Sequence, residues 1–157
     1  MEIDHNRVHE RLFGPEGAPP PVTQALGGRV ASLSDRALES EYVGAPAFLN
    51  PAGHIQGGIL SAMLDDVTAL LVVSTLSEGE QCATLSLNTS FLRPAKVGKL
   101  LGRSTLDARS PGARRVQRVR RAVAGRQARG DGIGGVRDRA ARRIKVTARR
   151  KPGSTSH

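Results

Sequence analysis

Residues 56–73 read QGGILSAMLDDVTALLVV, and this stretch decides the fold because it joins a diglycine to a long apolar run. The apolar residues cover most of the circumference of a helix, which predicts a core helix wrapped by other structure. One polar stripe at helical spacing contains Gly58, Ser61, Asp65 and Thr68, whereas Asp66 points elsewhere and is the weaker candidate. Two acids and two hydroxyl residues make the run too polar for a membrane span.

The start of this helix has the character of an anion site. Gly57 and Gly58 allow a ligand to approach the backbone, and the unpaired amides of a helix start favour a developing negative charge. This is the chemistry of an oxyanion hole. Asp65 lies about 12 Å further along the axis, whereas reacting groups must sit within about 3 Å of one substrate atom. If the glycine amides and Asp65 cooperate, they belong to different subunits and catalysis requires a dimer.

The flanks of the helix predict strands on both sides. Residues 29–34 and 37–43 have strand character, with a polar break at Asp35 and Arg36. Residues 44–53 form a loop rich in proline, asparagine and glycine. Residues 83–91 alternate between apolar and polar side chains, so we expect a half-buried strand that Pro94 closes.

The spacing of these pieces resembles a known family. Asn50 precedes the Gln56-Gly57-Gly58 triplet by six residues, Asp65 follows Gln56 by nine, and the strand ends in FLRPA at residues 91–95. This pattern resembles the hotdog-fold acyl-CoA thioesterases of the phenylacetate-degradation (PaaI-like) type, over about residues 28–101. The resemblance implies an α+β hotdog fold, in which a long central helix is wrapped by an antiparallel sheet. It also implies hydrolysis of acyl-CoA by a homodimer or homotetramer.

The resemblance assigns catalytic roles to Asp65, Gly57, Gln56 and Asn50. Asp65 would act as nucleophile or as general base on water, and the Gly57 amide would bind the thioester oxyanion. The family's frequent histidine is Gln56 here, and a glutamine can orient a carbonyl but cannot shuttle protons at neutral pH. Gln56 and Asn50 would therefore position the substrate or shape the loop.

The substrate-binding residues implied in the same way are Gly58, Thr84, His54 and Arg93. Thr84 would help to place the water, and His54 fits a loop position better than a catalytic one. Arg93, Lys96 or Lys99 could meet the phosphates of coenzyme A, and the sequence does not choose among them. No metal and no separate cofactor are expected, because coenzyme A is part of the substrate.

Each of these residues also has a purely structural explanation. Asp65 could be a paired core carboxylate, Asn50 could make an Asx turn before Pro51, and the two glycines could form only a tight strand-to-helix joint. Cys82 is the sole cysteine and fits a structural thiol. For the protein, the alternatives are a hotdog module that binds acyl-CoA without turnover and a protein that binds nucleic acid through its basic end.

Charge divides the chain unevenly. Residues 1–101 hold 7 Lys and Arg against 11 Asp and Glu, a net of −4, while residues 102–157 hold 17 against 3, a net of +14. We therefore divide the chain into a lead-in (1–26), a hotdog domain (27–103) and a basic Arg/Gly/Ala-rich tail (104–157). No aromatic residue is interleaved with the arginines of the tail, so base stacking is not indicated and nucleic acid is not expected as a partner.

Residues 102–143 lack sustained patterning, although the hotdog pattern needs further strands here, so the last strands are expected to be missing or altered. We interpret the tail as the product of a changed reading frame. Synonymous codons for residues 116–143 permit, one base later, a peptide starting CNVSGELWQDGKLVATA, which has the pattern of a hairpin. The nucleotide sequence tests this interpretation.

The lead-in predicts a short helix over residues 5–13, with Val8, Leu12 and Phe13 as its apolar face, followed by a proline-rich extended stretch. The chain has neither the apolar core of a signal peptide nor a transmembrane segment, so we expect a cytoplasmic protein with no membrane partner.

Overall fold

The computed structural model describes residues 9–10, 12–14, 16–77, 80–109, 115–125 and 144–150, with side chains up to residue 106. The described elements, in chain order, are α2 (Pro21–Ala25), β1 (Arg29–Leu33), β2 (Ala37–Gly44), the 3-10 helix η1 (Pro46–Phe48), α3 (Gly57–Val73), β3 (Glu80–Ser86), β4 (Gly98–Arg109), β5 (Arg115–Gly125) and β6 (Ile144–Arg150).

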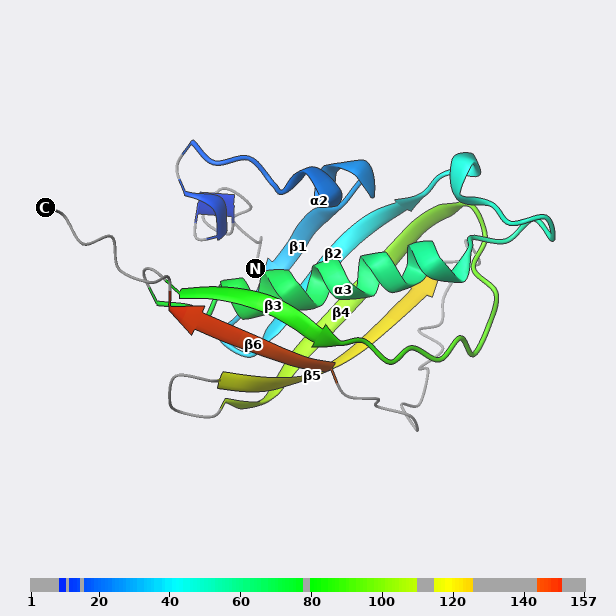
Figure 1. Ribbon diagram of the computed structural model, residues 1–157. Helices are drawn as coiled ribbons and strands as arrows, with labels where there is room; N and C mark the ends of the chain where they lie inside the picture. Colours follow the sequence, from blue (N-terminus) through cyan, green and yellow to red (C-terminus); the bar gives the residue numbers. More distant parts are fainter. Residues whose placement is uncertain are drawn as a thin grey trace, which may run out of the picture.

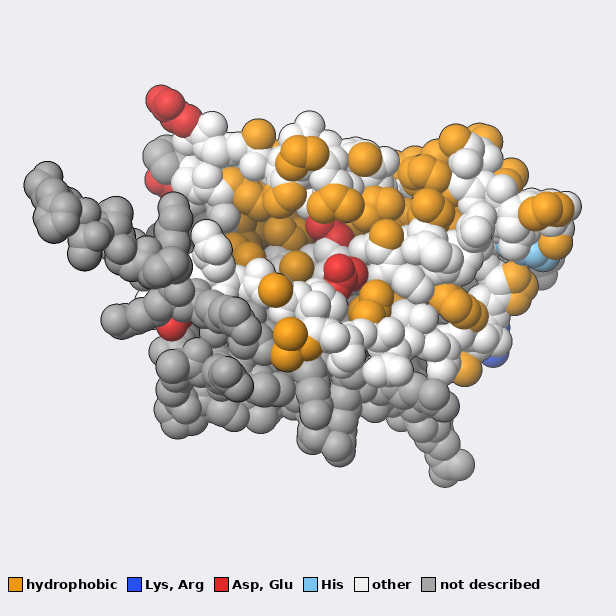
Figure 2. All heavy atoms as spheres, viewed as in Figure 1, with side chains coloured by type: hydrophobic (Ala, Val, Ile, Leu, Met, Phe, Trp, Pro, Cys, Tyr) orange, Lys and Arg blue, Asp and Glu red, His pale blue; other side chains and the backbone are white. Residues whose placement is uncertain are grey.

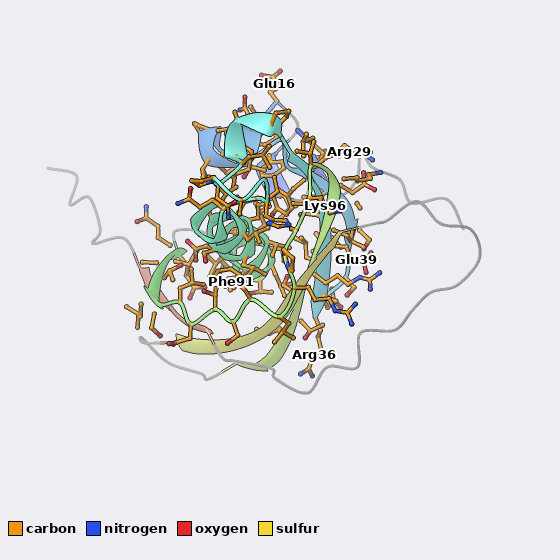
Figure 3. The ribbon with its side chains drawn as sticks, turned by 90° about the vertical axis from the view of Figure 1, so that its right-hand side faces the viewer. Glu16, Arg29, Arg36, Glu39, Phe91 and Lys96 are labelled. Atoms are coloured by element: carbon orange, nitrogen blue, oxygen red, sulfur yellow. The ribbon has the colours of Figure 1, made fainter. Side chains whose placement is uncertain are left out.

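One antiparallel sheet with the strand order β1-β2-β4-β5-β6-β3 wraps around α3 (Figure 1). Viewed from the side, α3 lies in the concave face of the sheet, and Arg36 and Glu39 point away from the helix (Figure 3). This arrangement confirms the predicted α+β hotdog fold with its long central helix.

The helix α3 fills the core as its apolar run predicts. Met63, Val67 and Leu71 are fully buried, and Leu38 of β2 and Leu100 of β4 are fully buried within the same cluster. Val73 ends the helix, where the Ser74 amide donates to the carbonyl of Leu70. Each large apolar side chain that is buried contributes about 1.5–3 kcal/mol to the free energy of folding, so the packing of this helix stabilises the fold strongly.

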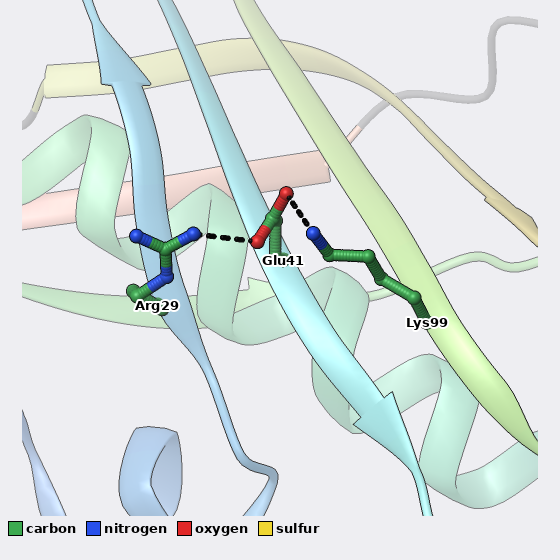
Figure 4. A network of polar contacts seen from close by, with 3 residues as sticks. All are labelled: Arg29, Glu41 and Lys99. Atoms are coloured by element: carbon green, nitrogen blue, oxygen red, sulfur yellow. Dashed lines mark hydrogen bonds and ion pairs between the residues drawn. The ribbon is translucent and has the colours of Figure 1, made fainter. Parts of the chain in front are cut away.

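The outer face of the sheet carries charge instead. Glu41 of β2 lies between Arg29 of β1 and Lys99 of β4, at 2.8 Å and 2.6 Å from their nitrogens (Figure 4). Both cations hold the pKa of the Glu41 carboxyl below its usual range, Lys99 more strongly than Arg29. Buried and more exposed residues alternate along β2, as expected for a strand with one face on the core.

The predicted strand over residues 83–91 is shifted and too long. The observed β3 spans Glu80–Ser86, and residues 87–94 leave the sheet. In that segment the Thr89 hydroxyl lies 3.2 Å from the Ser61 hydroxyl of α3. The alternating pattern therefore continues past Ser86 into a segment that contacts the helix through side chains, where sheet pairing has ended.

The C-terminal third contributes strands to the backbone of the sheet. The boundary expected after residue 103 falls inside β4, and β5 and β6 lie within the segment that we assigned to a tail. Ladder hydrogen bonds join main-chain groups whatever side chains they carry, so weak patterning does not prevent pairing.

The lead-in is partly packed on the domain. Residues 9–10 and 12–13 are helical, Leu12 is buried in the core cluster, and Val8 lies outside the described residues. Further on, α2 places Thr23 and Leu26 in the interior. In the part of the chain that the structure describes, no helix is both long enough and apolar enough to cross a membrane.

Candidate active site

The amino end of α3 is open to a ligand. Gln56 precedes the first helical residue with an extended backbone (φ −62°, ψ 140°) and its side chain makes no capping hydrogen bond. The Gln56 amide donates to the carbonyl of Phe48, which fixes the entry of the chain into the helix. The first amides of α3 therefore lack a side-chain cap, as an anion site at a helix start requires.

A pocket of about 300 Å³ opens at this helix end. Its polar groups come from Asn50, His54, Arg93 and the backbone of Gly57, and its apolar walls are Ile55, Leu60, Phe91 and Leu92. An apolar cavity with a few convergent polar groups is the usual form of a small-molecule site.

Asn50 shapes the loop beside the pocket. Its Oδ1 accepts hydrogen bonds from the amides of Ala52 (3.0 Å) and His54 (3.1 Å). The Asn50 amide in turn donates to the carbonyl of His54 at 2.8 Å. This is the Asx-type arrangement that the asparagine before Pro51 allowed, and it places the His54 side chain at the pocket.

The residues at 54 and 56 occupy different surroundings. His54 is half-buried and lines the pocket, whereas the Gln56 side chain is exposed and does not line it. Of the two neighbours of the diglycine, the histidine is therefore the one that the structure brings into this cavity.

The two glycines differ in the same way. A Cβ atom at Gly57 would lie 3.0 Å from ring atoms of Phe91, whereas a Cβ atom at Gly58 would meet no described atom within 4 Å. Gly57 lines the pocket and Gly58 is exposed beside it. The close approach of an aromatic ring gives Gly57 a structural requirement that Gly58 lacks.

Asp65 lies two turns further along α3, on a half-buried face. Its Oδ1 accepts a hydrogen bond of 2.8 Å from the Thr84 hydroxyl of β3. On the face of the molecule that Figure 2 shows, acidic side chains lie next to a band of hydrophobic ones. Asp65 is not part of the pocket wall, which agrees with the axial distance of about 12 Å between residues 57 and 65 of one helix.

The neighbouring acid, Asp66, is the buried one of the pair. Its Oδ1 accepts from the Thr23 hydroxyl at 2.6 Å and its Oδ2 from the Tyr42 hydroxyl at 2.8 Å. Burial raises the pKa of the Asp66 carboxyl, and the two donors oppose this shift. The sequence separates the two acids correctly by direction, but it gives no sign of these partners.

The three candidate phosphate-binding cations are separated by their positions. Arg93 lines the pocket, whereas Lys99 lies on the outer face of the sheet and pairs with Glu41 (Figure 4). Lys96 is exposed on the segment before β4. The pocket therefore brings only Arg93 of these three close to the Gly57 backbone.

The sole cysteine has a place in the structure. Cys82 is half-buried against the core, and burial raises the pKa of its thiol, as for an unreactive structural cysteine. Among the residues with described positions, no group of three or more His, Cys, Asp and Glu side chains forms a metal site.

Sequence reasoning missed Phe91 and Leu92 as pocket residues. Both belong to the FLRPA segment, and only its arginine was selected. No local pattern marks these two side chains as pocket residues, because their place depends on how residues 87–94 lie against α3.

Known proteins share sequence and fold with this chain. The thioesterase superfamily profile matches residues 52–109, which include the diglycine, Asp65 and Thr84. A phenylacetic acid degradation-related protein from Ralstonia eutropha JMP134 is 40% identical, with a TM-score of 0.67 over 91% of this chain and 96% of that one. The chain belongs to the thioesterase superfamily. It is a hotdog-fold thioester hydrolase, as the resemblance of its motifs to that family implied.

More distant structures share the fold alone. A thioesterase from Haemophilus influenzae is 17% identical with a TM-score of 0.62, over 83% of this chain and 84% of that one. A thioesterase family protein from Silicibacter pomeroyi is 21% identical with a TM-score of 0.65, over 92% and 99%. No match was found among curated proteins.

Proposed function

We propose that this thioesterase hydrolyses acyl-CoA in a site shared by two protomers, with Asp65 from one and the Gly57 amide from the other. The observation that carries this proposal is the separation of the two groups: the pocket contains Gly57 and excludes Asp65. Reacting groups must meet at about 3 Å from one carbonyl. A second copy of the chain supplies the missing partner.

The surface around Asp65 supports a second copy. Leu85, Phe91 and Leu92 are 61%, 54% and 74% exposed, and all three follow or belong to β3. The strand β3 is last in the strand order, so within the described sheet only β6 pairs with it. Apolar side chains at an unpaired sheet edge favour association with another chain. We take a homodimer as the minimal unit, and a homotetramer is compatible with it.

In the proposed reaction, the thioester carbonyl carbon is attacked by water activated by Asp65, or by the Asp65 carboxylate itself. The carbonyl oxygen becomes negatively charged and accepts a hydrogen bond from the Gly57 amide, whose position at a helix start favours that charge. The carbon–sulfur bond then breaks, and coenzyme A leaves as the thiol after it takes up a proton. In the direct-attack route, water subsequently hydrolyses the acyl anhydride on Asp65.

The remaining pocket residues bind and position the substrate in this proposal. Thr84 orients the Asp65 carboxylate through its hydrogen bond, and Asn50 holds the loop that carries His54. Arg93 is suited to a phosphate of coenzyme A because a guanidinium offers paired donors to phosphate oxygens. Gln56 and Gly58 border the entrance of the same helix end. No cofactor or metal is required.

Hydrolysis is tested by following thiol release from phenylacetyl-CoA, acetyl-CoA and palmitoyl-CoA. We expect turnover of at least one substrate by the wild-type chain, and its loss in Asp65→Asn with the oligomeric state unchanged. Binding of these substrates without turnover would instead support a non-catalytic acyl-CoA-binding module.

The shared site is tested by mixing two inactive chains. One carries Asp65→Asn and the other carries Gly57→Pro, which removes the amide donor. Random assortment makes half of the dimers mixed, each with one intact site, so about one quarter of the wild-type activity should return. Absence of recovery in mixtures that contain verified mixed dimers would place both groups in one protomer and contradict the proposal.

A further inference from the structure

The middle of α3 is held by a set of buried polar contacts that the proposed chemistry does not use. Asp66 accepts hydrogen bonds from Thr23 of α2 and Tyr42 of β2, at 2.6 Å and 2.8 Å. One residue further, the carbonyl of Val67 accepts a hydrogen bond of 2.9 Å from the Ser104 hydroxyl of β4. Three elements therefore contact the helix within two residues of Asp65.

The place of Tyr42 in this set is defined closely by the backbone around it. A Cβ atom at Gly28 would lie 2.9 Å from one edge of the Tyr42 ring, and a Cβ atom at Gly102 would lie 2.9 Å from the other. Tyr42 is 1% exposed. The ring thus fits a slot between two glycines, and the slot directs its hydroxyl to Asp66.

The position of Thr23 is also closely defined by its contacts. It is 1% exposed, and its carbonyl accepts a hydrogen bond of 2.7 Å from the Gly28 amide. A Cβ atom at Gly28 would also lie 2.8 Å from the methyl group of Thr23. The chain between α2 and β1 therefore needs a glycine to bring Thr23 and Tyr42 onto the same carboxylate.

The hydrogen bonds to Asp66 restrict the rotation of α3 about its own axis, which apolar packing defines less closely. Hydrophobic burial is non-directional, so an apolar helix in an apolar groove has limited control over its rotation about its own axis. Hydrogen bonds from two sides to one buried carboxylate are directional. Since neighbouring residues of a helix differ by about 100° in direction, fixing Asp66 toward α2 and β2 also fixes Asp65 toward Thr84 of β3.

We propose that Thr23, Tyr42 and Asp66 form an anchor that sets the rotation of α3 and thereby aims the Asp65 carboxylate at the thioester. Asp66 and Tyr42 are positioning residues: they act through Asp65 and do not touch the substrate. This inference rests on the proposed role of Asp65. It assigns a part in catalysis to the lead-in, since Thr23 precedes the first strand of the domain.

The anchor is tested with variants that remove a hydrogen bond and keep the shape. Tyr42→Phe leaves the ring in its slot, Asp66→Asn keeps the size of the side chain, and Thr23→Val replaces the hydroxyl with a methyl group of similar size. A misplacement of about 1 Å can cost up to about 100-fold in rate. We expect kcat for the best acyl-CoA substrate to fall by about 10- to 100-fold, with KM changed by less than about threefold.

Two controls separate positioning from loss of stability. Val72→Ala destabilises the buried far end of α3 without touching the anchor, and it should keep the wild-type kcat at the same reduction in melting temperature. Thr23→Ser restores the donor and should recover most of the kcat lost in Thr23→Val. The comparison of Thr23→Val with Thr23→Ser also keeps the test valid if Asp66→Asn fails to fold.

The outcomes distinguish this inference from the proposed function. If Asp65→Asn is inactive and the folded anchor variants keep the wild-type kcat, the anchor is only structural and the inference is overturned. If Asp65→Asn remains active, the proposed catalytic role of Asp65 is contradicted. The anchor then has no catalytic carboxylate to position.

Discussion

The side chains of Thr84 and Asp65 are joined by a hydrogen bond of 2.8 Å, from Oγ1 of the threonine to Oδ1 of the aspartate, which links β3 to the middle of α3. One carboxylate oxygen is thereby occupied and oriented. The other is left for water or substrate within the proposed shared site. The contact connects the sheet edge expected at the subunit interface with the residue expected to do the chemistry.

Loss of this contact should reduce the rate without preventing binding. In Thr84→Val the shape is kept and the donor is removed, and a hydrogen bond to a charged group contributes about 1.5–3 kcal/mol. We expect kcat to fall by roughly tenfold or more, with KM nearly constant, and Thr84→Ser to retain most activity. Thr75→Val removes a hydroxyl beyond the end of α3 and serves as the control. An unchanged kcat in Thr84→Val would show that this hydrogen bond is dispensable.

A second prediction concerns the amide of Gly57. Gly57 is the first residue of α3, a position where proline is well tolerated, and the extended backbone of Gln56 suits a following proline. Gly57→Pro therefore removes the N–H group with little cost to the helix. Gly57→Ala is its matched control, because it keeps the N–H group and adds the same Cβ atom beside Phe91.

We expect Gly57→Pro to be about 100- to 1,000-fold slower than Gly57→Ala in thiol release, the usual cost of losing one oxyanion donor. Any smaller loss in Gly57→Ala should be partly recovered by adding Phe91→Leu, which gives the new methyl group room. Equal rates for the proline and alanine variants would exclude the Gly57 amide as the oxyanion donor.

The features that could be predicted from the sequence are those encoded locally. The apolar run from Ile59 to Val73 defines α3, because helical periodicity is a property of neighbouring residues. Gly57 and Asp65 are eight residues apart on one helix, so their separation follows from helix geometry, and the shared site proposed above rests on it. The charged break at Asp35 and Arg36 likewise marks the turn between β1 and β2.

The remaining features depend on contacts between distant parts of the chain. Thr23 and Asp66 are 43 residues apart, and no local pattern connects a lead-in threonine with a helix carboxylate. The alternation over residues 83–91 does not reveal where pairing ends, because β6, the partner of β3, lies in a segment with weak patterning. Phe91 enters the pocket only because residues 87–94 fold back along α3.

The ion pairs around Glu41 give the protein a predictable response to acid. Lys99 and Arg29 hold the pKa of Glu41 below its usual range, so the folded state binds this proton less readily than the unfolded state. The stabilisation is present above the ordinary glutamate pKa of about 4.3 and is lost as the pH falls through the lowered value. Because the three side chains are partly exposed, the contribution should stay below about 1 kcal/mol.

This contribution is measured by urea unfolding of the wild-type chain and Glu41→Gln at pH 7 and at pH 4. The difference in free energy of unfolding between the two chains should shrink at the lower pH. Glu16→Gln, at an exposed position of the lead-in away from the sheet, provides the control (Figure 3). A difference that grows on acidification would contradict the assigned sign.

The last prediction concerns the origin of residues 116–143. The superfamily profile ends at residue 109, close to the point where the composition becomes rich in arginine. In the register of the sheet, Ser104, whose hydroxyl contacts α3, is paired with Arg121. The backbone register thus places arginine-rich sequence directly beside a strand that contacts α3, at the point where the superfamily profile has ended.

We therefore expect the nucleotide sequence, read one base later from codon 116, to encode an uninterrupted strand, an Asp-Gly-Lys turn and a second strand. A chain with that frame restored should show a higher melting temperature and a higher rate of thiol release than the present chain, because apolar residues would then complete the sheet over α3. Stop codons or an unpatterned polar peptide in the shifted frame would contradict a change of reading frame. The arginine-rich strands would then be the native sequence of this thioesterase.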